Sequence, residues 1–309
     1  MRRKRLTDFL VYVFIRILIC IAQAIRLETG RALARSLAWL LNDVIRLRGG
    51  VIDENLVHAF PDLSAKQRSN LARRMWEHLF LLVVEVAHTP RKIHDTNWRQ
   101  FVRLRDVAPL VKLLMGPRPV IIVTGHFGNF ELGGYALGIL GFPTYTVART
   151  LDNLYLDRFV NRFRGGTGQH IIPKNGGYEQ ILEVLHGGGT MAFLADQYAG
   201  EKGCWVEFFG RPASAHKAIA LLALEHDAPV AVCAARRLDR PMRFEMTNFG
   251  IIDPRQAGSQ VGSVRDLTQW YTSKLEEAIR SVPDQYWWLH RRWKDTRKKR
   301  PARPEKEAA

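Results

Sequence analysis

Two kinds of apolar spacing alternate along the chain from about residue 119 onward. Short continuous apolar runs, such as PVIIVT at 119–124, are separated by segments in which apolar residues recur every three or four positions. The short runs are typical of strands buried on both faces, and the wider spacing is typical of amphipathic helices. Strands that alternate with helices predict an α/β fold, with a mixed, mostly parallel sheet covered by helices.

The pattern gives approximate bounds for these elements. The predicted strands are 119–124, 143–148, 190–196, 205–209 and 229–237, with an outer strand at 242–249. The predicted helices are 27–48, 64–88, 130–140, 178–186, 214–226 and 264–281. Ser64 with Gln67 predicts a capping box at the start of the second of these helices.

The N-terminal segment is apolar enough to meet a membrane. Residues 6–25, LTDFLVYVFIRILICIAQAI, are interrupted only by Asp8 and Arg16, and the basic run RRKR precedes them. About 20 apolar residues are needed to cross a bilayer, and basic residues beside such a run attract anionic lipid. Three interpretations stay open: an uncleaved anchor that spans the membrane, a helix that lies in its surface, and an ordinary core helix.

These features divide the chain into three predicted regions. We expect an N-terminal membrane anchor or interfacial helix at 1–27, a catalytic domain at 28–295, and a basic, disordered tail at 296–309. The three cysteines lie far apart and form no C-x-x-C pair, so the sequence predicts neither a disulfide framework nor a zinc site.

The chain is strongly basic, which indicates an anionic partner. Its formal net charge is +16, from 46 Lys and Arg against 30 Asp and Glu. Nucleic acid, membrane headgroups and an acidic protein are the three classes of partner that such a charge suits. The sequence has no G-x-G-x-x-G after a strand, no phosphate-loop lysine and no G-x-S-x-G, so neither a nucleotide enzyme nor a serine hydrolase is indicated.

Candidate chemistry lies in the turn after the first predicted strand of the sheet. The stretch VIIVTGHFGNFELGG, residues 120–134, places His126 and Glu131 just beyond a strand, where α/β sheets gather their active groups. Gly125 and Gly128 permit a sharp turn, so the two side chains are able to meet. We predict a His–carboxylate dyad, in which His126 is a general base and Glu131 orients its ring. A packed histidine beside a surface glutamate is the alternative.

The motif H126-F-G-N-F-E131 resembles that of the late acyltransferases of lipid A biosynthesis, within the glycerolipid acyltransferases. The resemblance continues in order through nearly the whole chain after the N-terminal segment. It includes ENLVHAFPDLS (54–64), Arg149, DRFVNRFRGGTG (157–168), FLADQ (193–197), VEFFGRPAS (206–214) and PDQYWWLHRRWK (283–294).

The resemblance implies transfer of a fatty acyl chain from an acyl carrier protein thioester to a hydroxyl of a lipid-linked sugar. It implies no metal, no further cofactor and no covalent acyl-enzyme, with a site at the cytoplasmic face of the inner membrane. Acyl carrier protein, a glycolipid acceptor and the anionic membrane surface are then the expected partners, and nucleic acid is not. The implied acceptor-binding residues are Arg149, Arg164 and Asp196, with Asn129 and Gln197 as candidate oxyanion donors. The alternatives are that the two arginines are solvated surface charges and that Asp196 positions an arginine or caps a helix or loop.

Other interpretations remain open from the sequence. The same dyad suits a thioesterase or lipid hydrolase, and related enzymes acylate other glycolipids or phospholipids. A basic nucleic-acid-binding protein would explain the charge but not the glycine–histidine–glutamate turn. The aromatic residues Tyr286, Trp287, Trp288 and Trp293 suit either a membrane interface or packing against the sheet.

Overall fold

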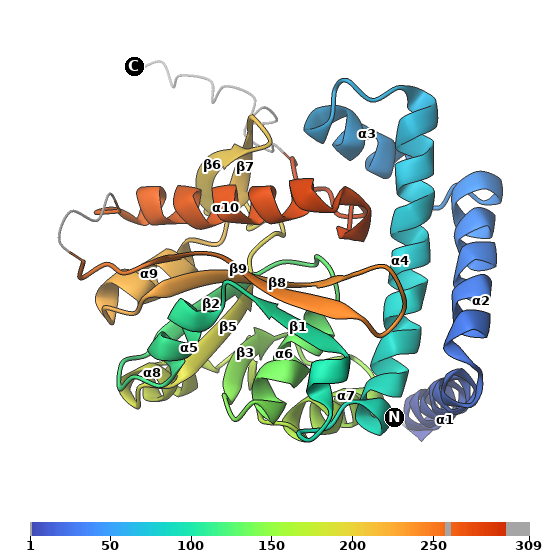
Figure 1. The fold of residues 1–309 in the computed structure, drawn as a ribbon, viewed down its shortest axis with the longest axis horizontal. Coiled ribbons are helices and arrows are strands. Elements are labelled where there is room, and N and C mark those ends of the chain that lie inside the picture. The colour runs from blue at the N-terminus through green and yellow to red at the C-terminus, as the bar shows by residue number, and fades with distance from the viewer. Residues whose placement is uncertain (1, 257–260, 295–309) are drawn as a thin grey trace, which may run out of the picture.

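One mixed sheet forms the centre of the molecule in the computed structural model, which describes residues 2–256 and 261–294 (Figure 1). Within these residues the sheet has seven strands, in the order β1-β9-β8-β2-β5-β3-β4. Every neighbouring pair is parallel except β8 and β9. The predicted mostly parallel, mixed α/β sheet is therefore confirmed. The strands are β1 (Val102–Arg105), β2 (Val120–Thr124), β3 (Thr144–Ala148), β4 (Gln169–Pro173), β5 (Thr190–Leu194), β8 (Val230–Arg237) and β9 (Phe244–Ile252).

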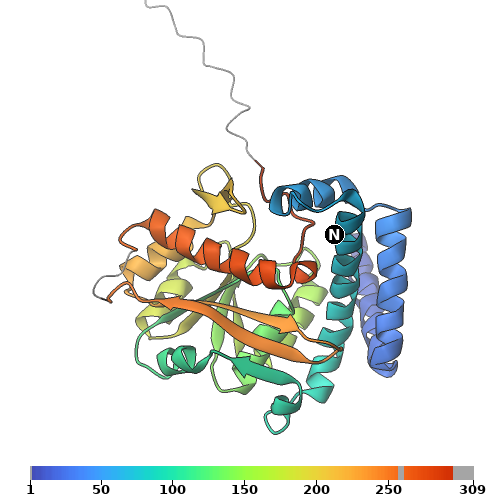
Figure 2. The ribbon, with the colours of Figure 1, turned by 45° about the horizontal axis from the view of Figure 1, so that its top comes forward.

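Helices cover both faces of this sheet. The helices of the described residues are α1 (Arg2–Ala24), α2 (Leu27–Trp39), α3 (Gly49–Ala59), α4 (Ala65–Lys92), α5 (Ala108–Leu114), α6 (Phe130–Ile139), α7 (Leu154–Gly165), α8 (Tyr178–His186), α9 (Lys217–Glu225) and α10 (Val264–Ser281). Of these, α1, α2 and α3 pack on α4 beside the sheet and not on its faces. In β2, Ile121 and Val123 pack with α9 and α10, whereas Val120 and Ile122 pack with α5 on the opposite face. This double burial is the physical reason that the strand is a continuous apolar run. Figure 2 shows α10 crossing its face of the sheet.

The predicted outer strand at 242–249 is wrong in its position. It forms β9, which lies inside the sheet between β8 and β1. The edge strand on this side of the sheet is β1, whose sequence VRLR exposes Arg103 and Arg105 and turns Val102 inward. Charged side chains of this kind are common on edge strands, where they hinder pairing with another chain.

The predicted strand at 205–209 also lies elsewhere. It forms β6 (Cys204–Phe208), which pairs antiparallel with β7 (Arg211–Ala215) in a separate two-stranded hairpin. The hairpin packs on α10, away from the main sheet (Figure 2). Local alternation predicted the strand but not its partner, because β-strand patterns do not specify which neighbour they pair with.

An α-helical layer lies beside one edge of the domain. The capping box at Ser64 is confirmed, since the Gln67 backbone amide donates to Ser64 Oγ and the Ser64 amide donates to Gln67 Oε1. The helix that follows, α4, runs four residues beyond its predicted end at His88. The predicted helix at 27–48 is α2 followed by a single π turn at Leu40–Val44.

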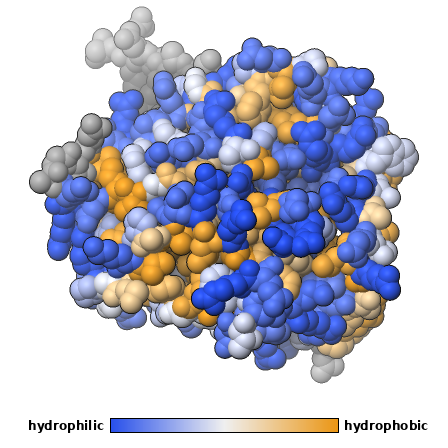
Figure 3. Space-filling view, viewed as in Figure 1, coloured by the Kyte–Doolittle hydropathy of each residue, from blue (hydrophilic) through white to orange (hydrophobic). Residues whose placement is uncertain are grey.

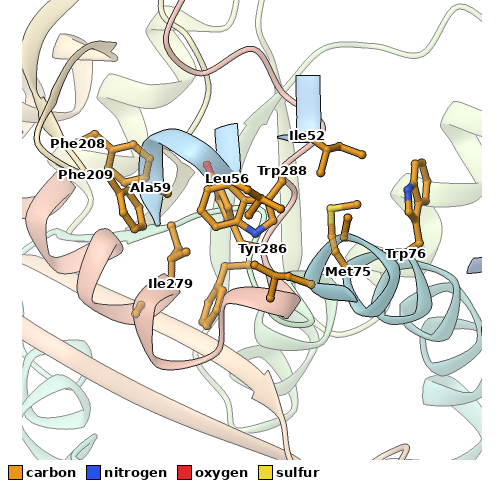
Figure 4. Packing of buried hydrophobic residues seen from close by; sticks show 14 of the residues in the cluster. Ile52, Leu56, Ala59, Met75, Trp76, Phe208, Phe209, Ile279, Tyr286 and Trp288 are labelled. Carbon is orange, nitrogen blue, oxygen red and sulfur yellow. The ribbon is translucent and has the colours of Figure 1, made fainter. Parts of the chain in front are cut away.

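The C-terminal aromatic segment packs against the interior. Tyr286 and Trp288 are 2% and 1% exposed, in a cluster with Leu56, Phe209 and Ile279 (Figure 4). The interpretation that these two rings face the membrane interface is therefore wrong, and the packing interpretation is confirmed. The predicted tail at 296–309 lies outside the described residues.

Candidate active site

A tight turn joins β2 to α6 and carries the candidate base. At Gly128 the backbone φ is +59°, and a Cβ there would lie 2.2 Å from the Ala235 carbonyl oxygen. The Gly128 amide donates to the Gln285 carbonyl at 3.0 Å, and the Asn129 amide donates to the Ala235 carbonyl at 2.7 Å. Only glycine fits here without strain or a clash, so the motif fixes the direction of the His126 side chain.

The carboxylate that contacts His126 is Asp196. His126 Nδ1 lies 2.9 Å from Asp196 Oδ1, and the His126 backbone amide donates to Oδ2 at 2.9 Å. The two residues follow β2 and β5, which are adjacent and parallel with Thr124 opposite Leu194. Parallel neighbours end at the same edge of a sheet, which brings residues 70 positions apart into contact.

The protonation state of this pair follows from its surroundings. Asp196 is buried, which by itself would raise the pKa of its carboxyl, but the charge and hydrogen bonds of His126 hold that pKa below its ordinary value. The carboxylate is therefore ionised and accepts a hydrogen bond from Nδ1–H. In a neutral imidazole this leaves the lone pair on Nε2, the atom that a general base needs.

Glu131 has a different partner from the one predicted. It forms a two-bond ion pair with Arg164 of α7, in which Arg164 Nε donates to Oε2 at 3.0 Å and Arg164 Nη2 donates to Oε1. The expectation that Glu131 orients the His126 ring is thus corrected, because Asp196 occupies that position. A catalytic role for Glu131 stays a prediction.

The Nε2 side of the ring faces a small polar and aromatic group. The Gln197 side-chain amide nitrogen lies 3.4 Å from His126 Nε2 and 3.3 Å from His290 Nε2. The Trp287 and Phe130 rings contact the imidazole at centroid distances of 4.9 and 5.2 Å. Burial and the neighbouring His126 lower the pKa of His290, so His290 is neutral and accepts from the amide. The His126 side chain is still 15% exposed, which leaves it accessible.

Asn129 is not available as an oxyanion donor. Its side chain caps α6, with Oδ1 accepting from the Leu132 amide at 3.0 Å, and its Nδ2 donates to Glu85 at 3.2 Å. The residue is fully buried. The amides of His126, Gly128 and Asn129 also donate within the protein. These amides of the turn therefore do not supply an oxyanion hole in this conformation.

A buried ionic cluster contacts the turn between β2 and α6. Arg237 donates two hydrogen bonds of 2.6 Å to Glu85, and its Nη1 lies 2.7 Å from His78 Nδ1. Because a guanidinium only donates, Nδ1 accepts and His78 Nε2–H donates to the Gly128 carbonyl at 3.1 Å. Sequence reasoning missed this cluster. A single glutamate within the apolar run LFLLVVEVAH was the signal that marked it.

The two predicted arginines lie beside one polar cavity of about 380 Å³. Glu131, Arg164, Arg149, Thr150 and Asn161 line it. Arg149 is largely exposed and pairs with Asp152 at 2.8 Å, so its guanidinium is able to reorient toward a ligand. No group of three or more His, Cys, Asp or Glu residues is placed to hold a metal ion in the part of the chain that the structure describes.

Comparison with known proteins gives one consistent result. The family model described as bacterial lipid A biosynthesis acyltransferase matches residues 2–295. The chain is 25% identical over 261 residues to the lipid A biosynthesis palmitoleoyltransferase of Escherichia coli, covering 81% of this chain and 80% of that protein. It is 21% identical over 256 residues to the lauroyltransferase of the same organism, with the same coverage. A 1-acyl-sn-glycerophosphate acyltransferase structure from Thermotoga maritima is a looser match, with a TM-score of 0.38, 12% identity, and coverage of 85% of this chain and 100% of that one.

Proposed function

Since this chain belongs to the bacterial lipid A biosynthesis acyltransferase family, which indicates acyl transfer to lipid A, we propose that His126 and Asp196 catalyse the transfer. The proposed donor is the thioester of an acyl carrier protein, and the proposed acceptor is a hydroxyl of a lipid A precursor. The observation that carries this proposal is the 2.9 Å contact between His126 Nδ1 and Asp196, which places the proton on Nδ1 and the lone pair on Nε2.

The proposed step is direct acyl transfer. His126 Nε2 removes the proton of the acceptor hydroxyl while the hydroxyl oxygen attacks the thioester carbonyl carbon. The carbon–sulfur bond then breaks, and the departing thiolate takes the proton back from the imidazolium, so the base is regenerated. Asp196 holds the tautomer and stabilises the imidazolium that forms between these steps, as general-base catalysis requires.

Gln197 defines where the acceptor hydroxyl enters. Its side-chain amide nitrogen lies 3.4 Å from His126 Nε2 and donates a long, weak hydrogen bond to the lone pair of that atom. A hydroxyl at ordinary hydrogen-bond distance from Nε2 would displace this amide, which still has His290 as a partner. The displaced amide would then lie beside the reacting carbonyl, where it can donate to the developing oxyanion.

The adjacent cavity suits the anionic part of such an acceptor. Arg164 stays cationic, because its hydrogen bonds to Glu131 raise its pKa against the effect of burial. Arg149 is held only by an exposed ion pair, which contributes little. A sugar phosphate would find one fixed and one movable guanidinium there, and guanidinium forks match phosphate oxygens.

Membrane attachment is proposed to occur through α1, at the cytoplasmic face of the inner membrane. Lys4–Ala24 is long and apolar enough to cross a bilayer, and it is the only such helix within the described residues. It nevertheless contacts the domain near both ends: Asn153 Nδ2 donates to the Asp8 carbonyl at 2.8 Å, and Gln23 Nε2 donates to the Ala87 carbonyl at 2.7 Å. A helix packed lengthwise on the domain favours the in-plane interpretation, with its outer face in lipid.

The assay that tests the proposal measures two products together. Full-length protein is incubated with acyl carrier protein thioester and an under-acylated lipid A precursor, and mass spectrometry follows the lipid and the free fatty acid. We expect the lipid to gain one acyl group, and the His126→Ala variant to lose this activity. His94→Ala is the matched control, since His94 is exposed and bonds only to nearby residues.

Two outcomes would contradict the proposal. Free fatty acid released at the same rate without any lipid acceptor would indicate a thioesterase. A fully active His126→Ala protein would remove the base from the mechanism. Acylation of a phospholipid or of another glycolipid in preference to the lipid A precursor would keep the chemistry but change the acceptor.

A further inference from the structure

The arginine in the middle of α1 turns away from the exposed face of that helix. Arg16 Nη1 donates to the Tyr12 hydroxyl at 3.3 Å, and the guanidinium carbon lies 4.6 Å from the centre of the Phe159 ring on α7. Its Nε is buried and has no hydrogen-bond partner within the described residues. The side chain therefore brings a positive charge into the space between α1 and α7.

A cavity of about 550 Å³ fills this space. Arg158 and Arg162 of α7 line it at a spacing of four residues, which places them on one face of the helix. Tyr12, Tyr155 and Phe163 supply aromatic walls. The cavity that contains Glu131 and Arg164 lies along the other side of α7, so the two cavities are distinct.

The charged residues that line this cavity are all cationic. Arg16, Arg158 and Arg162 line it, and no Asp or Glu does. None of these three arginines makes an ion pair with another residue in the part of the chain that the structure describes. Arg16 is partly buried, whereas Arg158 and Arg162 are exposed. A partly buried cation needs an anionic partner to offset its loss of hydration, and three cations that line one cavity repel one another. An anion is therefore the ligand that the site lacks.

The surface around the cavity indicates what carries this anion. The outer face of α1 exposes Phe14, Ile17 and Ile21, each more than half accessible to solvent. Pale to orange apolar surface is visible at the lower right of Figure 3, where Figure 1 shows α1. A ligand with an anionic head and apolar chains would satisfy both surfaces at once, with its head between the arginines and its chains along α1.

We propose that this cavity binds the phosphodiester headgroup of an anionic phospholipid of the bilayer. The bound lipid would hold α1 in the membrane surface and fix α7 against it. The same helix presents Arg164 to the candidate active site on its other side, so lipid binding would also order the acceptor cavity. This inference concerns a second site and does not depend on the proposed acyl transfer.

Native mass spectrometry of the full chain in detergent tests the proposal by counting bound lipid. Phosphatidylglycerol is titrated against wild type and against the double variant Arg158→Gln with Arg162→Gln. We expect the double variant to bind roughly 30-fold more weakly, since each basic residue near an anionic lipid surface contributes about fivefold in affinity. The matched control is Arg240→Gln with Arg265→Gln, which removes two exposed arginines elsewhere and should bind as wild type does.

Control ligands distinguish binding of the whole anionic lipid from binding of its soluble headgroup alone. Phosphatidylcholine should bind more weakly than phosphatidylglycerol, and glycerol phosphate should not compete at equal concentration. Arg158→Lys with Arg162→Lys keeps both charges and should retain most of the binding. Equal binding by the Gln variant and its control, or full competition by glycerol phosphate, would overturn the proposal.

A labelling experiment keeps the proposal testable if the Gln variant fails to fold. A photoreactive phosphatidylglycerol should label peptides of α1 and α7 in the wild-type protein. Labelling confined to other parts of the chain would overturn the assignment, whatever the acyltransferase activity proves to be.

Discussion

At the scale of single residues, the site is defined by which carboxylate reaches the histidine. Asp196 contacts both the ring and the backbone amide of His126, and this double contact fixes the turn as well as the tautomer. Glu131 is paired with Arg164, and both line the cavity that we propose for the acceptor. The two acids therefore have different partners, although the spacing in the sequence predicted that Glu131 contacts His126.

Replacement of Asp196 by asparagine tests this division. We expect Asp196→Asn to lower kcat by about 10²–10⁴-fold, with a small change in the KM of the lipid acceptor, because the charge that stabilises the imidazolium is lost. Acyl-transfer kinetics measure both constants. Asp227→Asn is the control, since Asp227 is an exposed carboxylate paired only with Arg255 in a surface bridge. Unchanged kcat in Asp196→Asn would assign the orienting role to another group.

At the scale of elements, α4 supports the catalytic turn through the buried cluster of Glu85, His78 and Arg237. Glu85 also accepts a hydrogen bond from the Met242 amide at 3.1 Å, so the carboxylate links α4, the turn and the segment after β8. A fully bonded buried cluster of this kind makes the arrangement of elements specific, since any other register would leave charges unpaired.

The cost of breaking this cluster is the second prediction. Glu85→Ala leaves the Arg237 guanidinium buried without its carboxylate, and we expect the free energy of unfolding to fall by about 3–5 kcal/mol. Denaturant titration of the purified protein measures this loss. Glu85→Leu combined with Arg237→Met should recover a large part of it, and a double variant as unstable as Glu85→Ala would contradict the argument.

The pH dependence of stability gives a third prediction at the same scale. Burial, followed by the charge of Arg237, lowers the pKa of His78 well below 6.5 in the folded protein. The unfolded chain binds a proton as pH falls through 6.5 while the folded protein does not. The stability that His78 contributes is therefore present above pH 6.5 and is lost progressively below it, by about 2 kcal/mol between pH 7 and pH 5.

Removal of the titrating group isolates this effect. Glutamine at position 78 keeps one donor and one acceptor but does not titrate, so His78→Gln should lose about 2 kcal/mol less than wild type over the same pH range. Denaturant titrations at pH 7 and pH 5 provide the comparison. Equal losses in both proteins would show that His78 is not the group responsible.

At the scale of the whole molecule, the helix proposed to meet the membrane lies close to the candidate active site. The first turns of α1 lie next to Asn153, at the start of α7, and α7 borders the acceptor cavity. A lipid substrate could therefore reach the site without leaving the membrane surface. The basic character of the chain suits the partners that we propose, an anionic lipid surface and an acidic donor protein.

The exposed face of α1 provides the fourth prediction. We expect Phe14→Asp, Ile17→Asp and Ile21→Asp together to move the protein from the membrane to the soluble fraction, because these side chains are exposed and charges in an apolar bilayer are costly. Cell fractionation with immunodetection measures the shift. The triple variant Met115→Asp, Tyr178→Asp and Leu221→Asp changes exposed apolar residues elsewhere and should stay with the membrane.

Local features of this protein follow from residues that are close together in the sequence. The spacing of apolar residues predicted most strands and helices, because the residues that face the core recur at the period of each helix or strand. The glycine turn gave the position of His126, since the φ at Gly128 and the close Ala235 carbonyl demand glycine. The apolar run of α1 and the capping box at Ser64 are equally local.

Contacts between residues that are distant in the sequence depend on how the folded elements are arranged. The place of β9 inside the sheet, the separate β6–β7 hairpin and the burial of Tyr286 all depend on strand order and packing across the chain. The carboxylate partner of His126 depends on them as well. Asp196 reaches the ring because β5 is the neighbour of β2, and no periodicity within either strand specifies that neighbour.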